Sequence, residues 1–291
     1  MTMRISATHW GLVRPVYDNS RLTGLLPHEA DPAPSPVLSE LARLPYSAAR
    51  IRRPAIRAGF LKGNRDGTHR GQEPFVEVSW DTALDLAADA IDRTYRNYGP
   101  SAVFGRSYGW KSTGLVNSSI TLLRRLLNLC GGFVGAVNSY STAAIATVLP
   151  YVLGVSDPQS ESWESVLAHS ERIIFWGCDP LITNDVDWCT TLHNARPYFD
   201  RLKASGIPTI SVNPLRTETA RFLESRWLAP KPGTDVALLL VLMYAILENG
   251  IDEATLTRLT DGWPVLKGYL LGTGDGIAKT PAWAEAITGI P

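Results

Sequence analysis

Two short segments carry the side chains with the clearest chemical potential. Residues 106–112 read RSYGWKS and residues 138–144 read NSYSTAA. Tyrosine O–H and tryptophan N–H groups are donors on rigid apolar bodies, and they can polarise an oxygen atom without exchanging a proton. Ordinary proton-transfer catalysis does not need this set, whereas a hard, high-valent metal bound through an oxygen anion could use it. We interpret Tyr108 and Trp110 as candidate site residues; the alternative for Trp110 is a structural role, since the chain has nine tryptophans.

The hydroxyl of Ser141 has three interpretations. A highly charged metal favours loss of the hydroxyl proton, and the resulting oxygen is a hard ligand. A nucleophilic serine is a second interpretation, but the context Tyr140-Ser141-Thr142 lacks the glycines of a nucleophile elbow. The third is a helix N-cap, which the position also fits. Spacing alone favours the N-cap.

Composition excludes several classes of protein. The formal net charge is zero, with 28 basic and 28 acidic residues, so bulk charge predicts no nucleic-acid and no membrane-surface partner. A local basic cluster remains, and it is either a phosphate site or a solvated face: Arg50, Arg52, Arg53 and Arg57. The three cysteines form no C-x-x-C pair, which argues against a disulfide framework, a cysteine-bound cluster and a zinc site. None of the five histidines has metal-ligand spacing to another.

The compartment is predicted from the same features. Scattered cysteines are typical of a reducing environment. Residues 1–10 contain no long apolar run and no twin-arginine pair, and no segment is apolar for the length of a membrane helix. We therefore expect a cytoplasmic protein.

The first half of the chain is expected to place both segments beside one helix. Residues 1–75 are rich in Pro, Arg and Gly, which predicts an irregular region with short β pieces. A helix is predicted to start after Ser79 as N-cap and to end at Gly99-Pro100, followed by a short strand over 102–104. Further helices are predicted over 115–129 and 143–153, with Pro150 limiting the last one.

From about residue 160 strands and helices alternate. Strands are predicted over 172–176, 208–212 and 227–229, with helices over about 188–205 and 235–248; this pattern is typical of βαβ units and a parallel sheet. Residues 272–291 read as a loop and a short helix that stop inside a doubly wound domain, so the domain looks interrupted. The predicted fold class is α/β: an irregular N-terminal β region (1–75), then parts of two doubly wound parallel-sheet domains (76–160 and 161–291).

Ligands of open parallel sheets bind beyond the carboxyl ends of the strands. Three polar loops are expected there, over 177–184, 213–219 and 231–235. Neither a G-x-G-x-x-G nor a P-loop motif occurs, so the alternatives are a nucleotide held by these loops and a plain domain with polar loops. Asp179, Asn184 and Asp185 are interpreted either as a carboxylate cluster or, more simply, as turn and cap residues.

Several motifs occur together in order along the chain. They are His9-Trp10-Gly11, SYGWKS at 107–112, YST at 140–142, Asp179-Pro180, NPLRTET at 213–219, GTDVAL at 233–238, and a segment from Tyr269 to Thr280 that contains GDGIAKT. Together they resemble the dimethyl sulfoxide reductase family of molybdopterin oxidoreductases, over essentially the whole chain. The segment from Tyr269 to Thr280 is most similar to the biotin sulfoxide reductase branch.

The resemblance implies a cofactor, molybdenum held by two molybdopterin guanine dinucleotides, and a role for each matching residue. Ser141 would be the protein ligand of the metal, Tyr108 would hydrogen-bond the oxo or substrate oxygen, and Trp110 would pack over the metal. The implied cofactor-binding residues are Trp110, Lys111, Ser112, Asp179, Pro180, Thr183, Asn184, Asn213, Pro214, Arg216, Thr217, Glu218, Thr219, Gly233, Thr234 and Asp235.

The implied reaction is oxygen-atom transfer. An S-oxide or N-oxide of the biotin, methionine or dimethyl sulfoxide type is reduced to the sulfide or amine with two electrons and two protons, and water is released. Within the resemblance, the presence of Tyr108 weakly favours S-oxides over trimethylamine N-oxide as substrates. The sequence does not identify the electron donor.

Two departures from the family pattern leave an alternative open. Family members usually have Asp where Ser139 stands, and they are far longer than 291 residues. The alternative is a truncated, non-catalytic fragment that binds a nucleotide or a separate C-terminal half. An unrelated NAD-type dehydrogenase is a further alternative, which the missing glycine fingerprint argues against.

Overall fold

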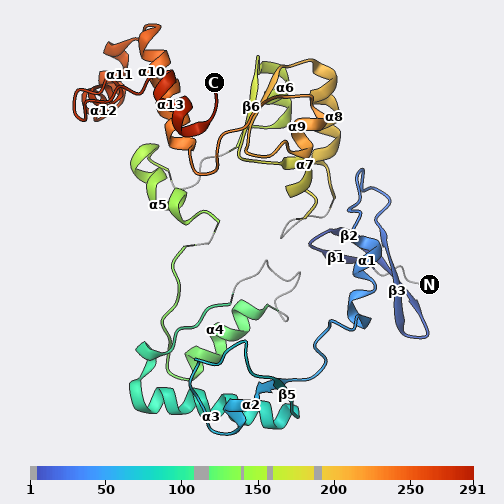
Figure 1. Cartoon of the computed structure of the whole chain (residues 1–291). Helices are drawn as coiled ribbons and strands as arrows, with labels where there is room; N and C mark the ends of the chain where they lie inside the picture. Colours follow the sequence, from blue (N-terminus) through green and yellow to red (C-terminus); the bar gives the residue numbers. More distant parts are fainter. Residues whose placement is uncertain (1–4, 108–117, 139–140, 156–159, 187–191) are drawn as a thin grey trace. The chain divides into compact units, whose positions relative to one another are not determined.

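The chain forms two compact units in a computed structural model that describes residues 5–107, 118–138, 141–155, 160–186 and 192–291 (Figure 1). The first unit contains residues 1–160 and 186–193, and the second contains residues 161–185 and 194–291. The segment 186–193 belongs to the first unit. The imidazole Nδ1 of His193 lies 2.8 Å from the Asp31 carboxylate, and both side chains are buried.

The first unit begins with a three-stranded antiparallel sheet in the order β1-β2-β3. Its strands are β1 (Ser6–Thr8), β2 (Gly11–Asp18) and β3 (Arg21–Pro27). Asn19 and Ser20 connect β2 to β3 with positive φ at both residues, the backbone that a two-residue hairpin turn requires. The expected β pieces are confirmed here, although β2 is longer than a short piece.

The rest of the first 75 residues contains short elements. They are α1 (Leu38–Leu41), a 3-10 turn η1 (Leu44–Tyr46), β4 (Ala55–Arg57) and α2 (Ala58–Leu61), with β4 paired antiparallel to β5 (Phe75–Glu77). Arg57 and Glu73 form an ion pair whose side chains are largely buried. This ion pair holds the connection between the paired strands.

The next part of the first unit surrounds the predicted chemical segments. It contains α3 (Trp80–Tyr98), a 3-10 turn η2 (Pro100–Ala102), α4 (Ser119–Leu129) and α5 (Ala143–Val152). The predicted N-cap is confirmed, because the Ser79 hydroxyl accepts from the Thr82 N–H at 3.1 Å. The Tyr95 hydroxyl donates to the Gly132 carbonyl at 2.6 Å, and this bond ties α3 to the loop after α4.

Two predictions in this part are wrong in extent. The strand over 102–104 is a single parallel bridge between Phe104 and Val134, because Pro100 starts a 3-10 turn that runs through Ala102. The helix predicted over 115–129 begins at Ser119, where the Ser118 hydroxyl caps it by accepting from Thr121. The helix at 143–153 is confirmed to within one residue, with Pro150 inside it.

The second unit confirms the predicted parallel sheet and the α/β class. Strands β6 (Ile173–Trp176), β7 (Thr209–Val212) and β8 (Arg226–Leu228) pair in parallel in that order. Its helices are α6 (Trp163–His169), α7 (Pro180–Thr183), α8 (Ala195–Ser205), α9 (Glu218–Phe222), α10 (Asp235–Glu248), α11 (Glu253–Leu259), α12 (Trp263–Leu270) and α13 (Pro281–Thr288). Phe175 of β6 packs with Phe199 and Leu202 of α8 to form the core.

Helix α10 has the predicted bounds, whereas α8 starts later than predicted. A helix over 188–205 would place Pro197 in its interior, where proline lacks the N–H and clashes with the preceding turn. The structure begins α8 at Ala195, so Pro197 lies in the first turn. The part of the prediction that falls on residues 187–191 lies outside the described residues.

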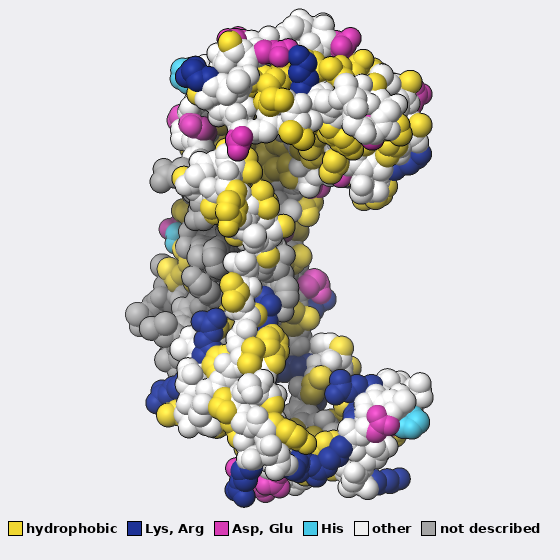
Figure 2. Space-filling model, turned by 90° about the vertical axis from the view of Figure 1, so that its left-hand side faces the viewer, with side chains coloured by type: hydrophobic (Ala, Val, Ile, Leu, Met, Phe, Trp, Pro, Cys, Tyr) yellow, Lys and Arg dark blue, Asp and Glu magenta, His cyan; other side chains and the backbone are white. Residues whose placement is uncertain are grey.

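Large hydrophobic side chains are exposed on several helices. On α5, Ile145, Val148 and Tyr151 are 56%, 53% and 90% exposed, and α3 has no buried residue. Figure 2 shows hydrophobic side chains gathered in patches among charged ones on one face. Among the described residues, no helix has both the length and the apolarity to cross a lipid bilayer.

Candidate functional site

The carboxyl ends of β6, β7 and β8 lie at one edge of the sheet, because the three strands are parallel. The loops that follow them contain the predicted binding residues of the second unit. The indole N–H of Trp176, the last residue of β6, donates to the Asp235 carboxylate at 2.9 Å. Strand β6 is thereby joined to the start of α10, so the first and third loops meet at this edge.

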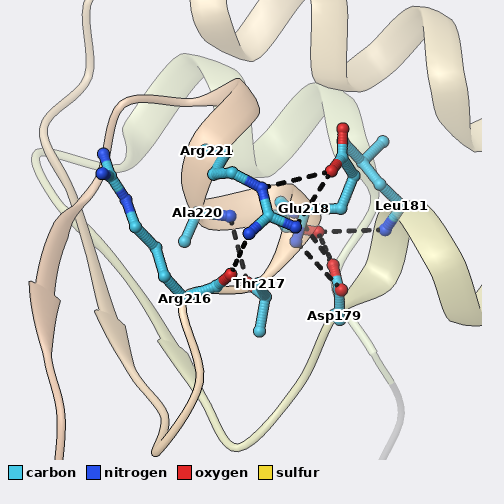
Figure 3. A network of polar contacts seen from close by, with 8 residues as sticks. Asp179, Leu181, Arg216, Thr217, Glu218, Ala220 and Arg221 are labelled. Atoms are coloured by element: carbon cyan, nitrogen blue, oxygen red, sulfur yellow. Dashed lines mark hydrogen bonds and ion pairs between the residues drawn. The ribbon is translucent and has the colours of Figure 1, made fainter.

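Asp179 joins the first loop to the second (Figure 3). Its carboxylate accepts from the Glu218 N–H at 3.1 Å, from the Thr219 N–H at 2.9 Å and from the Thr219 hydroxyl at 2.6 Å. The Leu181 N–H donates to the same threonine hydroxyl at 3.0 Å. Asp179 therefore caps α9, a helix that begins 39 residues after it.

The second loop, after β7, has a backbone fixed by hydrogen bonds and carries the charged side chain of Arg216. The Asn213 side chain accepts from the Leu215 N–H at 3.1 Å, an Asx turn, and its carbonyl accepts from the Trp227 indole at 2.7 Å. Thr217 is the N-cap of α9 and accepts from Ala220. Pro214 and Arg216 are exposed. The Arg216 guanidinium makes no hydrogen bond or ion pair with the residues that the structure describes.

The third loop ends at the N-terminus of α10. Gly233 has φ +79°, which suits glycine, and the hydroxyl of Thr234 donates to the Lys231 carbonyl at 2.6 Å. Because Thr234 makes no side-chain cap, the first N–H groups of α10 point outward from the helix end, with Asp235 in the first turn. This end of the helix carries partial positive charge.

The rest of the first loop is a short helix. Pro180 occupies the first turn of α7, where its missing N–H costs nothing, and Asn184 is its exposed C-cap. The Thr183 hydroxyl donates to the Asp179 carbonyl at 3.2 Å.

Burial, with a smaller contribution from the Asp179 carboxylate, raises the pKa of the Cys178 thiol. Cys178 is therefore protonated at neutral pH and a poor ligand or nucleophile.

In the first unit, the two segments singled out in the sequence each follow one residue of the same parallel β-bridge, Phe104–Val134. Residues 105–107 follow Phe104 and residues 135–138 follow its parallel partner Val134, so both chains run to the same side. They line a cavity of about 510 Å³ together with Ile120, Arg124 and Asn128 on one face of α4. Tyr108, Trp110, Lys111 and Ser112 lie outside the described residues, and their roles stay predictions.

Ser141 lies just before α5 and is exposed. The N-cap of α5 is Thr142, and no side chain caps this helix. The N-cap interpretation of Ser141 is therefore wrong, since the helix starts one residue too late for it. Within the described parts of the chain, the Ser141 hydroxyl has no hydrogen-bond partner, so it is available to a ligand.

The cavity in the first unit depends on a residue without a side chain. A Cβ atom at Gly105 would collide with Leu127 Cδ1 and come within 2.7 Å of Phe133 Cδ2. Leu127 is buried, so it has little room to move. We expect Gly105→Ala to destabilise the protein by about 1–3 kcal/mol, the usual cost of overpacking. Urea unfolding measures this, with Gly274→Ala as the control, because nothing lies within 4 Å of a Cβ there; equal stability of the two variants would contradict the packing argument.

The residues that join the loops are not predicted from the sequence. Trp176 and Trp227 end in indole donors that fix the first and second loops, and Leu181 contributes a backbone N–H. The only signal in the sequence is a tryptophan in two of the three strands predicted for this unit, 172–176 and 227–229. Among the described residues, no group of three His, Cys, Asp or Glu side chains could hold a metal ion.

A parallel sheet with polar loops and an open helix end at its carboxyl edge is the arrangement of α/β proteins that bind ligands at that edge. The family model for molybdopterin oxidoreductases matches residues 50–278, and the model for their N-terminal domain matches residues 6–44. The chain belongs to the molybdopterin oxidoreductase family, so the family inferred from the motifs is confirmed.

Relatives cover the whole chain. It is 39% identical over 292 residues to dimethyl sulfoxide/trimethylamine N-oxide reductase from Rhodobacter capsulatus, a match that covers 99% of this chain and 36% of that protein. It is 37% identical over 292 residues to trimethylamine-N-oxide reductase from Haemophilus influenzae, covering 99% and 35%. The chain thus spans about a third of the length of these relatives. The similarity to the biotin sulfoxide reductase branch stays a prediction.

A solved structure supports the fold. Acetylene hydratase from Pelobacter acetylenicus aligns with a TM-score of 0.57 and 21% identity, over 99% of this chain and 37% of that one. At this identity the likeness shows the fold alone.

Proposed function

We propose that this chain is the N-terminal part of a molybdenum-dependent oxidoreductase that transfers an oxygen atom from an S-oxide or N-oxide. Its family and the names of its relatives support the reaction class. The observation in the structure that carries the proposal is the exposed Ser141 hydroxyl, which caps no helix and has no partner among the described residues. We further propose a cytoplasmic location.

The donor set of the chain fits molybdenum held by two molybdopterin guanine dinucleotides. Ser141 offers a hard oxygen ligand, suited to a high-valent metal. The loop after β7 offers Asn213 and Arg216, and the loop after β8 leads to the open N-terminus of α10; these groups suit the phosphates and polar edges of a nucleotide. When bound, this cofactor supplies the two-electron redox chemistry that an oxygen-atom transfer needs.

The chain's own residues would hold and orient the reactants. Ser141 would anchor the metal through its side-chain oxygen. Tyr108 would donate its O–H to the substrate oxygen and stabilise the negative charge that develops there. Trp110 would cover the metal with an apolar ring and help to exclude water, and Lys111 and Ser112 would contact the cofactor.

We expect Tyr108→Phe, in the complete polypeptide, to lower kcat for sulfoxide reduction by about 100-fold, the usual cost of one donor to a developing oxyanion. Steady-state reduction of dimethyl sulfoxide, driven by a reduced viologen dye, measures this. Tyr98→Phe is the control, because Tyr98 is 70% exposed at the end of α3. Unchanged kcat in Tyr108→Phe would remove the donor role. Detection of no sulfoxide or N-oxide reduction by the wild type would contradict the proposed reaction.

A second candidate function is favoured by the exposed apolar face of α5. Contiguous exposed hydrophobic side chains are typical of interaction surfaces, and Ile145, Val148 and Tyr151 are each more than half exposed. Under this second candidate function, the chain is not catalytic by itself and binds a nucleotide or a separate C-terminal half. Co-expression of the chain with a family-type C-terminal half, followed by purification of one complex, tests it.

A further inference from the structure

Helix α3 carries a row of carboxylates on one exposed face. Four exposed aspartates recur at spacings of four, four and three residues, which places them on one side of the helix: Asp81, Asp85, Asp89 and Asp92. At 1.5 Å per residue the row is about 16 Å long. Asp92 pairs with Arg96 at 2.8 Å, whereas the other three form no ion pair with a described residue. We call these four residues the aspartate stripe.

A strongly basic segment precedes this helix in the chain. Residues 50–70, which we call the basic segment, contain seven arginine and lysine residues and one acidic residue, Asp66. Arg57 is neutralised by its largely buried ion pair with Glu73. The other six are exposed and pair with no carboxylate in the described ranges: Arg50, Arg52, Arg53, Lys62, Arg65 and Arg70. The chain as a whole has a formal net charge of zero, so this positive charge is local.

The backbone brings the basic segment next to the aspartate stripe. Strand β4 pairs with β5, and the Val78 N–H donates to the Pro54 carbonyl at 3.0 Å. Arg53 directly precedes Pro54, and Asp81 follows Val78 by three residues. The two charged surfaces therefore adjoin where β5 leads into α3. Lys and Arg side chains gather at this end of the first unit (Figure 2).

Exposed apolar side chains lie among these charges. Ile51, Trp80 and Leu84 are 84%, 67% and 59% exposed. Exposed ion pairs add little affinity, and their main effect is on orientation and choice of partner, whereas burial of apolar surface drives association. Aromatic residues and arginine are also enriched where proteins meet. The combination is typical of an interface between proteins and not of a charged face that stays in water.

We propose that the basic segment of one copy of this chain binds the aspartate stripe of a second copy. In a two-fold dimer this contact forms twice, because each copy offers both surfaces to the other. A nucleic acid, an anionic lipid surface or an acidic protein would be attracted by the basic segment and repelled by the stripe beside it. A second copy satisfies both surfaces at once.

Sedimentation velocity of the full chain, over a series of concentrations, measures this association. The wild type should form a dimer that weakens as NaCl rises from about 0.1 M to about 1 M, where the Debye length falls from about 10 Å to about 3 Å. Arg52→Glu/Arg53→Glu should weaken the dimer by at least about 100-fold, because like charges then face each other. Asp85→Lys/Asp89→Lys should weaken it to a similar extent for the same reason.

A matched control separates these contacts from an effect of net charge. Arg172→Glu/Arg258→Glu changes the net charge by the same amount as Arg52→Glu/Arg53→Glu, at two exposed arginines of the second unit. This control should dimerise like the wild type. Circular dichroism and urea unfolding establish that each variant is folded.

A mixture of the two reversed variants gives the most specific result. Arg52→Glu/Arg53→Glu carries two acidic surfaces, and Asp85→Lys/Asp89→Lys carries two basic ones. Each variant alone should therefore be monomeric, whereas an equimolar mixture should form a heterodimer. Damage to the fold of either variant would not produce this recovery, so the mixture distinguishes contact from misfolding.

Three outcomes would overturn the proposal. The first is a wild-type chain that stays monomeric at every concentration; if that monomer binds vesicles containing phosphatidylserine, the basic segment belongs to a lipid surface instead. The second is self-association that salt and charge reversal leave unchanged, or that the control loses equally, which would assign it to the exposed apolar side chains or to net charge. The third is a mixture of the two folded variants that remains monomeric.

Discussion

Ser141→Ala is expected to lower both the molybdenum content and the S-oxide reductase activity of the complete polypeptide by at least about 100-fold. Changes in the groups around a metal ligand already cost about 10- to 100-fold in affinity or activity, and loss of the ligand itself should cost more. The structure removes the simplest structural role for this hydroxyl, because Thr142 and not Ser141 is the N-cap of α5. Stability should change little, since the side chain is exposed and has no partner among the described residues.

Metal analysis and a sulfoxide assay on the same preparation measure this effect. Ser39→Ala is a suitable control, because Ser39 is another exposed serine of the first unit and makes only one long hydrogen bond, 3.5 Å, to the Pro36 carbonyl. Ser39→Ala should match the wild type in both measurements. A Ser141→Ala protein with normal metal content and normal activity would exclude Ser141 as a ligand.

Lys279→Ala is expected to cause the largest loss of stability in the second unit, about 2–4 kcal/mol, as for other buried groups that lose charged hydrogen bonds. The Lys279 side chain is 1% exposed, and its ammonium donates to the Asp275 carboxylate at 2.6 Å and to the Ile277 carbonyl. The ammonium also lies 4.0 Å from the ring centre of Tyr269. Alanine leaves a cavity and removes all of these contacts.

The control for this prediction is Lys267→Ala. Lys267 pairs with Glu253 at the same distance, 2.6 Å, but its side chain is 34% exposed and that of Glu253 is 48% exposed. Exposed ion pairs contribute about 0–1 kcal/mol. Urea unfolding of both variants should therefore show a much larger loss for Lys279→Ala, and equal losses would contradict the buried arrangement.

The effect of Lys279 should also depend on pH. The hydrogen bond from Lys279 lowers the pKa of the Asp275 carboxyl below its usual value. A carboxyl with a lowered pKa in the folded state stabilises the protein above its unfolded pKa, about 3.9, and this contribution is lost as the pH falls through the folded pKa. The difference in stability between wild type and Lys279→Ala should be constant from pH 5 to 7 and shrink below about pH 4.

The sequence predicts the elements whose signals are local. Helix α10 has its predicted bounds because a polar start at Asp235 is followed by an uninterrupted apolar run. The prediction of helix α8 starts too early, because proline is tolerated only in the first turn of a helix and Pro197 therefore requires a start close before it, at Ala195. The parallel sheet follows from the alternation of strands and helices, and the structure confirms it.

The site was predictable only as a set of loops. The sequence leaves open whether Asp179 belongs to a carboxylate cluster or to a cap, and the structure shows a cap on a helix 39 residues further along the chain. The bond from Trp176 to Asp235 spans 59 residues. Contacts at such separations depend on how the sheet brings the strand ends together, and no local pattern records them. Only the resemblance singled out Ser141 as a ligand.

X-ray absorption at the molybdenum edge, on the complete polypeptide, tests the central claim most directly. The account predicts one oxygen ligand of the oxidised wild type that is replaced by sulfur in Ser141→Cys, because a thiolate then stands where the serine oxygen bound the metal. Identical spectra of wild type and Ser141→Cys, at equal molybdenum content, would contradict it.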